Sequence, residues 1–199
     1  GETIGVIFDG LGYGSDGHLW GGEFLLGDYS GFRRVGQFDY VPMPGGDVAT
    51  REPWRMAVSY LMQAFGDDFR ESLLPFKANS IELKLIRKMV EKRLNSPLTS
   101  SCGRLFDAVA ALTSIREKVS FEGQAALELE MLLQDDADRA GSYPFRIRKE
   151  KGAFLVSATP MIKQLISDLR NNINKEDISA QFHNGLVRVV VDVCSAVRA

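Results

Sequence analysis

The sequence is poor in cysteine and histidine and has no long run of apolar residues. Its only cysteines, Cys102 and Cys194, lie far apart and form no CxxC pair, a usage typical of the reducing cytosol. A transmembrane helix needs about 20 consecutive apolar residues, and no such run exists. We find no signal peptide, internal repeat or low-complexity tract. These absences favour a globular cytoplasmic protein.

Neither sign of charge dominates. The chain has 24 basic and 26 acidic residues, a net charge of −2 and a sequence pI near 5.8. This balance gives no reason to expect nucleic acid or a membrane surface as the main partner. The 45 % hydrophobic content is that of an ordinary globular protein. With 199 residues, the chain predicts a single domain, or one large lobe of a bigger one.

The first part, residues 1–46, holds most of the nineteen glycines and predicts a meander of strands. Residues 3–8 are rich in Ile, Val and Phe, which predicts a buried strand. It leads into a glycine-rich loop over residues 9–17. Two further strands are expected over 19–26 and 32–41, joined by short polar turns that favour antiparallel pairing. The segment 42–47 then interrupts the strand pattern.

The remainder predicts a helical part over residues 47–140 and a hairpin with two helices over 141–199. Apolar spacing indicates helices over residues 53–65, 81–94, 104–115 and 123–138, with a loop over 97–103. The last of these helices ends in a run of acids that we expect to be solvated, at Asp135, Asp136 and Asp138. A hairpin is expected over 145–148 and 152–156, then helices over 159–169, capped by Thr159, and 176–197. Because nothing would cover the last apolar turn, we expect the natural protein to continue.

The glycine-rich loop has two interpretations. Glycines let the backbone approach an anion closely, and Asp9 at the strand end is a possible metal ligand near phosphate. Asp-Gly is also the strongest short signal for a hairpin turn. Glu23 is expected either to accept backbone N–H groups of this loop or to face solvent. Both readings of the loop remain open at this level.

Two arginines are candidates for anion binding. Arg51 and Arg55 follow the segment 42–47, and a guanidinium suits bidentate recognition of phosphate or carbamoyl oxygens. The alternative is an ion pair with Glu52 or Asp47. The two histidines, His18 and His183, are too far apart to suggest a metal pair, and no Ser-His-Asp arrangement supports hydrolysis.

Four long segments resemble, in the same order, motifs of the HypF carbamoyltransferases of NiFe-hydrogenase maturation. They are GVIFDGLGYGSDGHLWGGEF at 5–24, PGGD at 44–47 followed by REPWRMA at 51–57, SSCGRLFDAVAAL at 100–112, and FEGQAALELE at 121–130. Together they span the first two thirds of the chain.

The resemblance implies an α/β (α+β) fold of the actin-like ATPase type. We expect an RNase H-like lobe with a small mixed sheet and a helical insertion, truncated before its last strands. The family implies an ATP-dependent carbamoyltransferase that makes carbamoyl-adenylate from carbamoyl phosphate and ATP in another domain. The domain represented here then passes the carbamoyl group to the C-terminal cysteine of a partner protein, HypE. By itself, this fragment is expected to be inactive.

The resemblance also implies site residues. Asp9 matches a metal-ligand aspartate of related O-carbamoyltransferases. Asp107 matches a ribose-contacting aspartate of the threonylcarbamoyl-transferring enzymes of tRNA modification. The glycines expected beside nucleotide or phosphate are Gly10, Gly12, Gly14, Gly103 and Gly123.

Some residues differ from the motifs of these related families, and the differences help to decide between them. Arg104 stands where the threonylcarbamoyl enzymes have Glu, and Gln124 replaces a glycine of their turn, which both favour HypF. The family's paired metal histidines and a further metal-ligand loop are missing, so Asp9 alone would hold Fe or Zn weakly. The divalent metal is therefore expected only in the intact protein, together with the rest of the HypF chain.

Three other functions stay open. The piece alone would be a non-catalytic interaction module that docks HypE if it bound HypE but not nucleotide. A related threonylcarbamoyl or O-carbamoyl transferase lobe is the second. An actin-like sugar kinase lobe is the third, and the motifs at 12–23 and 51–57 argue against it.

Overall fold

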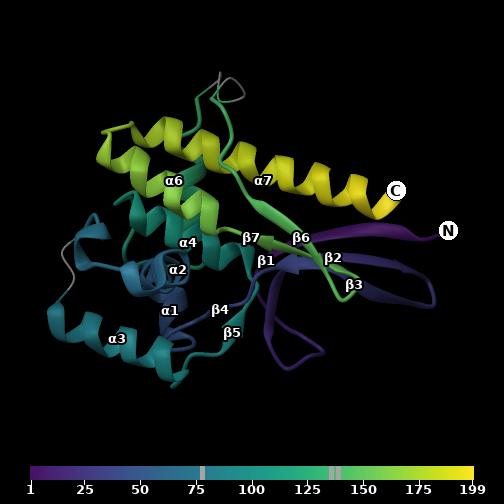
Figure 1. The fold of residues 1–199 in the computed structure, drawn as a ribbon, viewed down its shortest axis with the longest axis horizontal. Helices are drawn as coiled ribbons and strands as arrows, with labels where there is room; N and C mark the ends of the chain where they lie inside the picture. Colours follow the sequence, from purple (N-terminus) through teal and green to yellow (C-terminus); the bar gives the residue numbers. More distant parts are fainter. Residues whose placement is uncertain (77–78, 135–136, 138–139) are drawn as a thin grey trace.

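The computed structural model describes residues 1–76, 79–134, 137 and 140–199. It is a mixed α/β structure in which a seven-stranded sheet carries the N-terminal part and helices gather at one end of it (Figure 1). The elements, in chain order, are β1 (Thr3–Tyr13), β2 (Leu19–Asp28), β3 (Gly31–Phe38), β4 (Val41–Pro42), α1 (Val48–Arg51), α2 (Pro53–Phe65), the short turns η1 (Gly66–Asp68) and η2 (Glu71–Leu73), α3 (Ser80–Lys92), β5 (Leu98–Thr99), α4 (Cys102–Leu112), α5 (Gln124–Glu130), β6 (Arg146–Glu150), β7 (Ala153–Ser157), α6 (Thr159–Arg170) and α7 (Lys175–Arg198).

The sheet is mixed, as expected. Strands β1, β2 and β3 form the predicted antiparallel meander. Strand β7 pairs in parallel with the end of β3, and β6 pairs antiparallel with β7. The short strands β4 and β5 extend the other edge, where β5 meets the start of β2. The expected hairpin in the last third is confirmed, with its turn at Lys151 and Gly152, both in the left-handed region.

Two expectations about the first strand are wrong. It does not end at Phe8 but runs to Tyr13, so most of the predicted glycine loop is strand, and the turn covers only residues 14–18. Nor is it a buried strand, because Ile7 and Phe8 are 42 % and 37 % exposed. Its described pairing is with β2 alone, which leaves one edge and part of its apolar surface uncovered. An apolar run of this length does not distinguish a central strand from an edge strand.

The other strand and loop boundaries differ in smaller ways. The third strand ends at Phe38, and a separate short strand, β4, follows after a bend. The expected loop over 97–103 contains β5 and the first residues of α4. Helix α4 begins two residues early because Ser101 caps it, its side chain accepting a hydrogen bond from the backbone N–H of Arg104.

The helices were predicted better than the strands. Helices α2, α3, α6 and α7 agree with the expected ranges within three residues. Thr159 is not the cap of α6, however. Ala158 holds that position without a side-chain bond, and Pro160 already removes one of the N–H groups that a cap would satisfy.

Helix α5 is shorter than the expected 123–138, since it ends at Glu130. Leu127 on its outer face and Met131, the residue after it, are exposed. The acidic run at Asp135, Asp136 and Asp138 lies outside the described residues.

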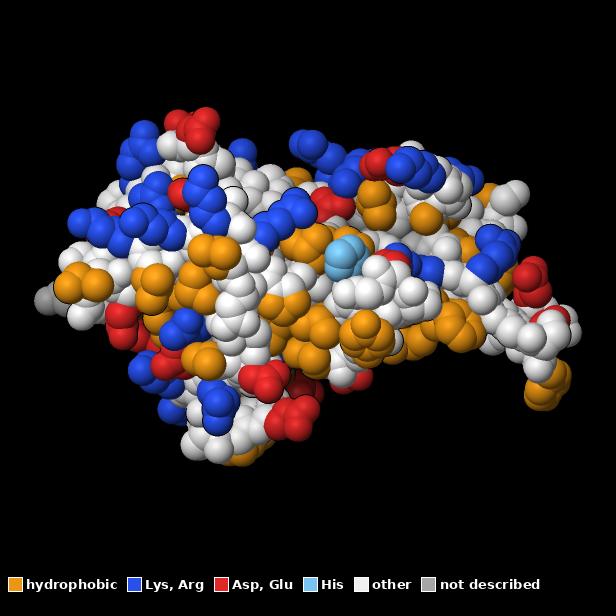
Figure 2. Space-filling view, turned by 90° about the horizontal axis from the view of Figure 1, so that it is seen from below, with side chains coloured by type: hydrophobic (Ala, Val, Ile, Leu, Met, Phe, Trp, Pro, Cys, Tyr) orange, Lys and Arg blue, Asp and Glu red, His pale blue; other side chains and the backbone are white. Residues whose placement is uncertain are grey.

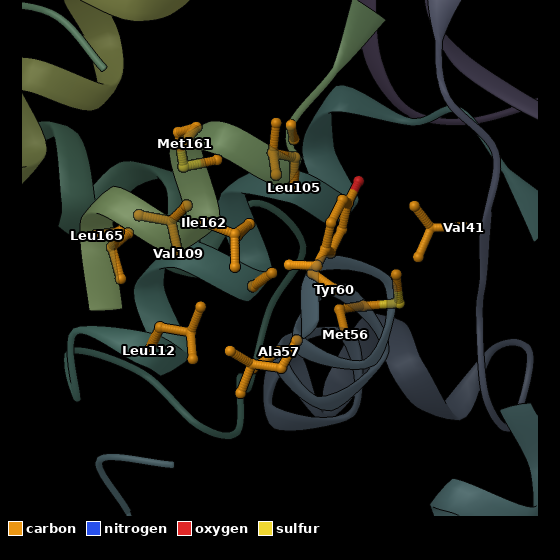
Figure 3. Packing of buried hydrophobic residues seen from close by; sticks show 14 of the residues in the cluster. Val41, Met56, Ala57, Tyr60, Leu105, Val109, Leu112, Met161, Ile162 and Leu165 are labelled. Carbon is orange, nitrogen blue, oxygen red and sulfur yellow. The ribbon is translucent and has the colours of Figure 1, made fainter. Parts of the chain in front are cut away.

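The hydrophobic core lies where α2, α4 and α6 meet (Figure 3). Helix α4 is rich in alanine, so its neighbours approach it closely. Helix α7 crosses above α6 and α4 and adds its own buried side chains to the same core (Figure 1). This packing fixes the position of α4, whose first turn reaches the sheet. The core residues labelled in Figure 3 are Val41, Met56, Ala57, Tyr60, Leu105, Val109, Leu112, Met161, Ile162 and Leu165.

Within the described residues, no helix combines the length and apolar character needed to cross a membrane. Hydrophobic side chains nevertheless reach the surface, and Figure 2 shows them gathered across the middle of one face of the molecule. On β1 alone, Ile7, Phe8, Leu11 and Tyr13 are exposed.

Two valines of α7 test how much the core depends on this helix. We expect Val189→Ala, at a side chain that is 2 % exposed, to lower the free energy of unfolding by about 2 kcal/mol. Val187→Ala, at a 63 % exposed position two residues earlier, should change it by less than about 0.5 kcal/mol. Urea unfolding followed by circular dichroism measures both. Equal effects would show that α7 does not pack as described.

Candidate functional site

The site is built around a bulge in β1. The pairing of β1 with β2 shifts register between Phe8 and Gly12, so that extra residues of β1 stand out from the ladder. These residues lie on the first turn of α4. A Cβ at Gly103 would come within 2.8 Å of the Gly10 Cα, and one at Gly21 within 2.5 Å of the Asp9 carbonyl oxygen. Glycine is therefore required where β1, β2 and α4 meet.

Ser101 holds the bulge to the helix. Its Oγ lies 2.7 Å from the carbonyl oxygen of Asp9 and 2.6 Å from that of Gly10, and its single proton is shared between them. The same oxygen accepts the N–H of Arg104 at 3.2 Å, as the N-cap of α4. One buried hydroxyl thus satisfies backbone groups of both elements, which makes the position of the bulge relative to α4 a fixed property of the fold.

Glu23 supports the same junction from the side of β2. This carboxylate is 1 % exposed, and its Oε2 accepts the N–H groups of Gly21 and Gly22 at 2.6 and 2.7 Å. Its Oε1 accepts the hydroxyl proton of Ser100. As expected, Glu23 accepts hydrogen bonds from backbone N–H groups, but these groups belong to β2 and not to the glycine-rich loop. The alternative, in which Glu23 faces solvent, is wrong.

Two adjoining hollows open beside the bulge. One, here called the Arg51 hollow, has a volume of about 390 Å³ and reaches from Gly10 to Thr50, Arg51 and Ser120. The other, the Asp107 hollow, has about 320 Å³ and is lined by Gly103 and Asp107 together with Phe8, Phe106 and Ala126. Both share the wall formed by Gly10, Arg104, Glu122 and Gly123.

The Asp107 hollow combines an apolar side with a few polar groups, the usual composition of a small-molecule site. Phe8 and Phe106 offer flat apolar surface, while Asp107 offers a carboxylate. Gly123 is the N-cap of α5 with φ near 76°, so a side chain there would be strained.

Arg104 and Asp107 form a buried ion pair between the two hollows. The guanidinium Nε and the carboxylate Oδ2 lie 3.0 Å apart, one helical turn from each other on α4, and each side chain is 7 % exposed. The two groups are not aligned for a hydrogen bond. In the described part of the chain, the only buried side-chain polar atoms without a hydrogen-bond partner are Arg104 Nε, Arg104 Nη1 and Asp107 Oδ2. Unsatisfied polar atoms of this kind are rare in native proteins, and a role in binding or catalysis is one explanation for them.

Burial raises the pKa of the Asp107 carboxyl to about 6, although the neighbouring Arg104 charge acts in the opposite direction. Desolvation therefore outweighs the ion pair at this position. A carboxylate with a raised pKa inside a hollow is a feature of functional sites.

The structure brings together most of the residues singled out in the sequence. Gly10, Gly103, Asp107 and Gly123 line the Asp107 hollow, and Asp9 lies at its edge. Arg51 lines the adjacent hollow. Sequence reasoning did not choose Arg104, Glu122 or Thr50 as site residues. One sequence feature could have identified Arg104: it precedes Asp107 by three residues, which places both side chains on one face of a helix.

Three of the singled-out residues lie outside both hollows. Gly12 continues β1 beyond the bulge, opposite Trp20. Gly14 makes room for the Trp20 indole, since a Cβ there would come within 2.0 Å of its Nε1. Arg55 donates from Nε to Glu52 Oε2 at 2.5 Å and lies over the Trp54 ring. Arg55 therefore forms the ion pair with Glu52 that was the alternative to anion binding.

The turn after β1 is held by side-chain contacts and lies outside both hollows. Asp16 accepts hydrogen bonds from Trp20 Nε1 at 2.9 Å and from Arg34 Nη2 and the Tyr40 hydroxyl at 2.6 Å each. The Arg34 guanidinium stacks on the Trp20 ring, 4.1 Å from its centre. These hydrogen bonds hold the pKa of the Asp16 carboxyl well below its usual range, against the effect of burial. The hairpin-turn interpretation therefore describes residues 14–18.

A metal site is not formed by the residues described here. Asp9 is exposed, and its Oδ1 accepts the N–H of Gly10 at 2.6 Å. Among the described residues, no three His, Cys, Asp or Glu side chains gather as a metal-binding group. Because transition-metal sites generally use three or four ligands, Asp9 could supply only one of them.

Comparison with known proteins places this geometry in a family. The family model described as "Carbamoyltransferase, Kae1-like Domain, second subdomain" matches residues 5–199. The chain is 41 % identical over 158 residues to the carbamoyltransferase HypF2 of Cupriavidus necator, covering 79 % of this chain and 19 % of that protein. It is 34 % identical over 207 residues to the carbamoyltransferase HypF of Synechocystis, covering 96 % of this chain and 26 % of that protein.

Two solved structures of HypF proteins superpose on the chain. A full-length HypF crystallised in its phosphate- and nucleotide-bound form superposes with a TM-score of 0.89 at 36 % identity, covering all of this chain and 25 % of that one. HypF of T. kodakarensis superposes with a TM-score of 0.79 at 27 % identity, covering 96 % and 26 %. The chain spans about a fifth to a quarter of the length of these relatives.

Two glycines test the contact between the bulge and α4. Gly103→Ala should lower the free energy of unfolding by about 1–3 kcal/mol, since its Cβ would overlap the Gly10 backbone. Gly12→Ala is the control, because its Cβ would have only an ordinary contact, 3.7 Å from the Trp20 carbonyl oxygen. Denaturant unfolding of both variants measures these free energies. A tolerated alanine at Gly103 would contradict the described approach of the two backbones.

The raised pKa of Asp107 predicts a pH dependence of stability. Its value is about 6 in the folded chain against 3.8 for an unperturbed carboxyl, so the folded state binds more protons between these pH values. The contribution of this group is therefore fully present below about pH 4 and is lost as pH rises through about 6. Relative to Asp107→Asn, wild type should lose roughly 1–3 kcal/mol of unfolding free energy between pH 4 and pH 7.5. A difference that grows in favour of wild type over this range would show that the Arg104 charge dominates.

Proposed function

The chain belongs to the HypF carbamoyltransferase family, as the second subdomain of its Kae1-like domain, and on this basis we propose that it forms part of a carbamoyl-adenylate site. In this proposal the intact protein makes carbamoyl-adenylate from carbamoyl phosphate and ATP. It then transfers the carbamoyl group to the C-terminal cysteine of HypE, for cyanide-ligand synthesis in NiFe-hydrogenase maturation. The Asp107 hollow holds the nucleoside end of the adenylate.

The observation that carries this proposal is the set of unsatisfied polar atoms on Arg104 and Asp107, at the junction of the two hollows. A buried polar atom without a hydrogen bond destabilises the folded protein, and a bound molecule that supplies hydrogen-bond partners can offset this cost. A ribose hydroxyl can donate to the Asp107 carboxylate, which lines the hollow, and a base can lie against Phe8 and Phe106. A HypF structure with the same fold is described as nucleotide-bound, which supports the same class of ligand here.

The chemistry asks little of the protein beyond positioning. The acceptor thiolate attacks the carbamoyl carbon, a C–S bond forms, and the bond from that carbon to the phosphate oxygen breaks. AMP leaves with the electron pair, and the thiol has already lost its proton. The described residues would orient the adenylate and stabilise the charge on the departing phosphate, contributions that can lower a barrier substantially.

Other parts of the intact protein complete the site in this proposal. Asp9 contributes one ligand to a divalent metal, Fe or Zn, whose remaining ligands lie outside the described residues. A metal there would offset phosphate charge. The exposed apolar side chains of β1, including Ile7, Leu11 and Tyr13, suit contact with the rest of a longer HypF chain. We place the protein in the cytoplasm, with HypE as its acceptor partner.

Calorimetric titration of the 199-residue chain with AMP tests the nucleotide site. We expect saturable binding that Asp107→Ala weakens by about 10- to 100-fold, corresponding to roughly 1–3 kcal/mol for one lost buried partner. Asp192→Ala, at an exposed carboxylate of α7 outside both hollows, is the matched control and should leave the affinity unchanged.

The alternative outcome is equally specific. If the chain does not bind AMP at millimolar concentration but binds purified HypE, the isolated piece is an interaction module. A site that requires the remaining strands and metal ligands would then exist only in the longer chain. Binding of AMP that Asp107→Ala does not alter would place the nucleotide elsewhere.

A further inference from the structure

Arg104 has an unusual environment for a guanidinium. The residue is 6 % exposed, and its neighbour Asp107 lies close without a well-aligned hydrogen bond. Nε and Nη1 are buried and have no hydrogen-bond partner, although Nε lies 3.0 Å from Asp107 Oδ2. Buried arginines normally have most of their five N–H groups satisfied, because each unpaired one carries a desolvation penalty. The side chain lines both hollows and therefore faces the space where a ligand would lie.

The third nitrogen, Nη2, lies directly under the bulge of β1. A Cβ at Gly10 would lie 3.8 Å from Nη2 and 4.0 Å from Glu122 Oε1. Glycine at this position leaves the approach to the guanidinium open, and any side chain would partly cover it. Nη2 thus lies near Gly10, which lines both hollows together with Arg104, Glu122 and Gly123.

The charges around the hollows suggest what this guanidinium recognises. The Arg51 hollow is lined by Arg51 and Arg104 but also by Asp47 and Glu122, so its formal charges cancel. Long-range attraction of an anion is therefore weak, and discrimination has to come from close contact. Of the two arginines, Arg104 is buried and little screened by salt, whereas Arg51 is exposed and strongly screened. A planar guanidinium with free N–H groups fits a phosphate.

We propose that Arg104 recognises the phosphate of the bound nucleotide at the junction of the two hollows and so distinguishes a nucleotide from its nucleoside. The nucleoside occupies the Asp107 hollow, and the phosphate lies beside Gly10, against Nη2. Arg51, across the other hollow, makes a weaker contribution. This inference rests on the proposed function, since it assigns one contact within that nucleotide site.

The test compares two probes, AMP and adenosine, on the wild-type chain and on Arg104→Gln, by calorimetric titration. We expect Arg104→Gln to raise the Kd for AMP by about 10- to 100-fold, as for loss of a charge-assisted hydrogen bond. The Kd for adenosine should change by less than about threefold. Equal losses for both probes would show that Arg104 only holds Asp107 in place, and no loss for AMP would remove it from the site. Either result overturns the proposal.

Two further arginine variants calibrate the effect. Arg51→Gln should raise the Kd for AMP by only about two- to fivefold, and this difference should fade at high salt, whereas the effect of Arg104→Gln should persist. Arg33→Gln, at an exposed position of β3 outside both hollows, is the matched control for removing a surface charge. A larger effect at Arg51 than at Arg104 would assign phosphate recognition to Arg51 and contradict the proposal.

A variant that leaves Arg104 intact guards against misfolding of Arg104→Gln. Gly10→Ala has no atom closer than 3.8 Å to its new methyl group, so the fold should tolerate it. The methyl group would stand between Nη2 and the ligand, and we expect the same selective loss of AMP over adenosine. If the wild-type chain binds neither probe, the proposed nucleotide site itself fails. If it binds both equally well, only the assignment of Arg104 fails.

Discussion

The candidate site depends on one constraint, the close approach of the β1 bulge to the first turn of α4. The two backbones meet so closely that Gly103 has no room for a side chain against Gly10, and the Ser101 hydroxyl binds carbonyl oxygens of the bulge while capping the helix. Helix α4 is held from the other side by the core of α2 and α6. The position of the glycine-containing strand over Arg104 and Asp107 is therefore set by the packing of the whole molecule. Any ligand at this junction meets a surface that is already formed.

The same junction carries a local loss of stability. Elsewhere in the described chain, buried polar side chains have partners: Glu23 accepts three hydrogen bonds, and Tyr143 donates to Asp168 at 2.9 Å. Arg104 and Asp107 are the exception. A buried ion pair rarely adds stability even when well aligned, because desolvation offsets the attraction. The fold thus tolerates an unfavourable pair at the one place where two hollows adjoin, which is the pattern expected of residues kept for binding.

Sequence reasoning failed where one pattern fits two structures. The apolar run at 3–8 is compatible with a central or an edge strand. In the structure β1 pairs with β2 and with no other described strand, so it is an edge strand. The glycines at 10, 12 and 14 look equivalent in sequence. In the structure Gly10 faces the hollows, Gly12 continues the strand, and Gly14 makes room for Trp20. Helix α5 ends at Glu130, earlier than its periodicity suggested.

The sequence by itself determined the family, the class of fold and most helices, because long motifs, helix caps and apolar spacing are local properties of the chain. It also singled out Gly103 and Asp107, which are four residues apart and therefore lie about one turn apart on helix α4. Only the tertiary structure decided which glycines border the hollows, that Arg104 belongs with them, and that Arg55 pairs with Glu52 instead. The reason is physical: burial, desolvation and the approach of two backbones arise between segments some ninety residues apart in the chain, as Ser101 and Asp9 are, and no local pattern encodes them.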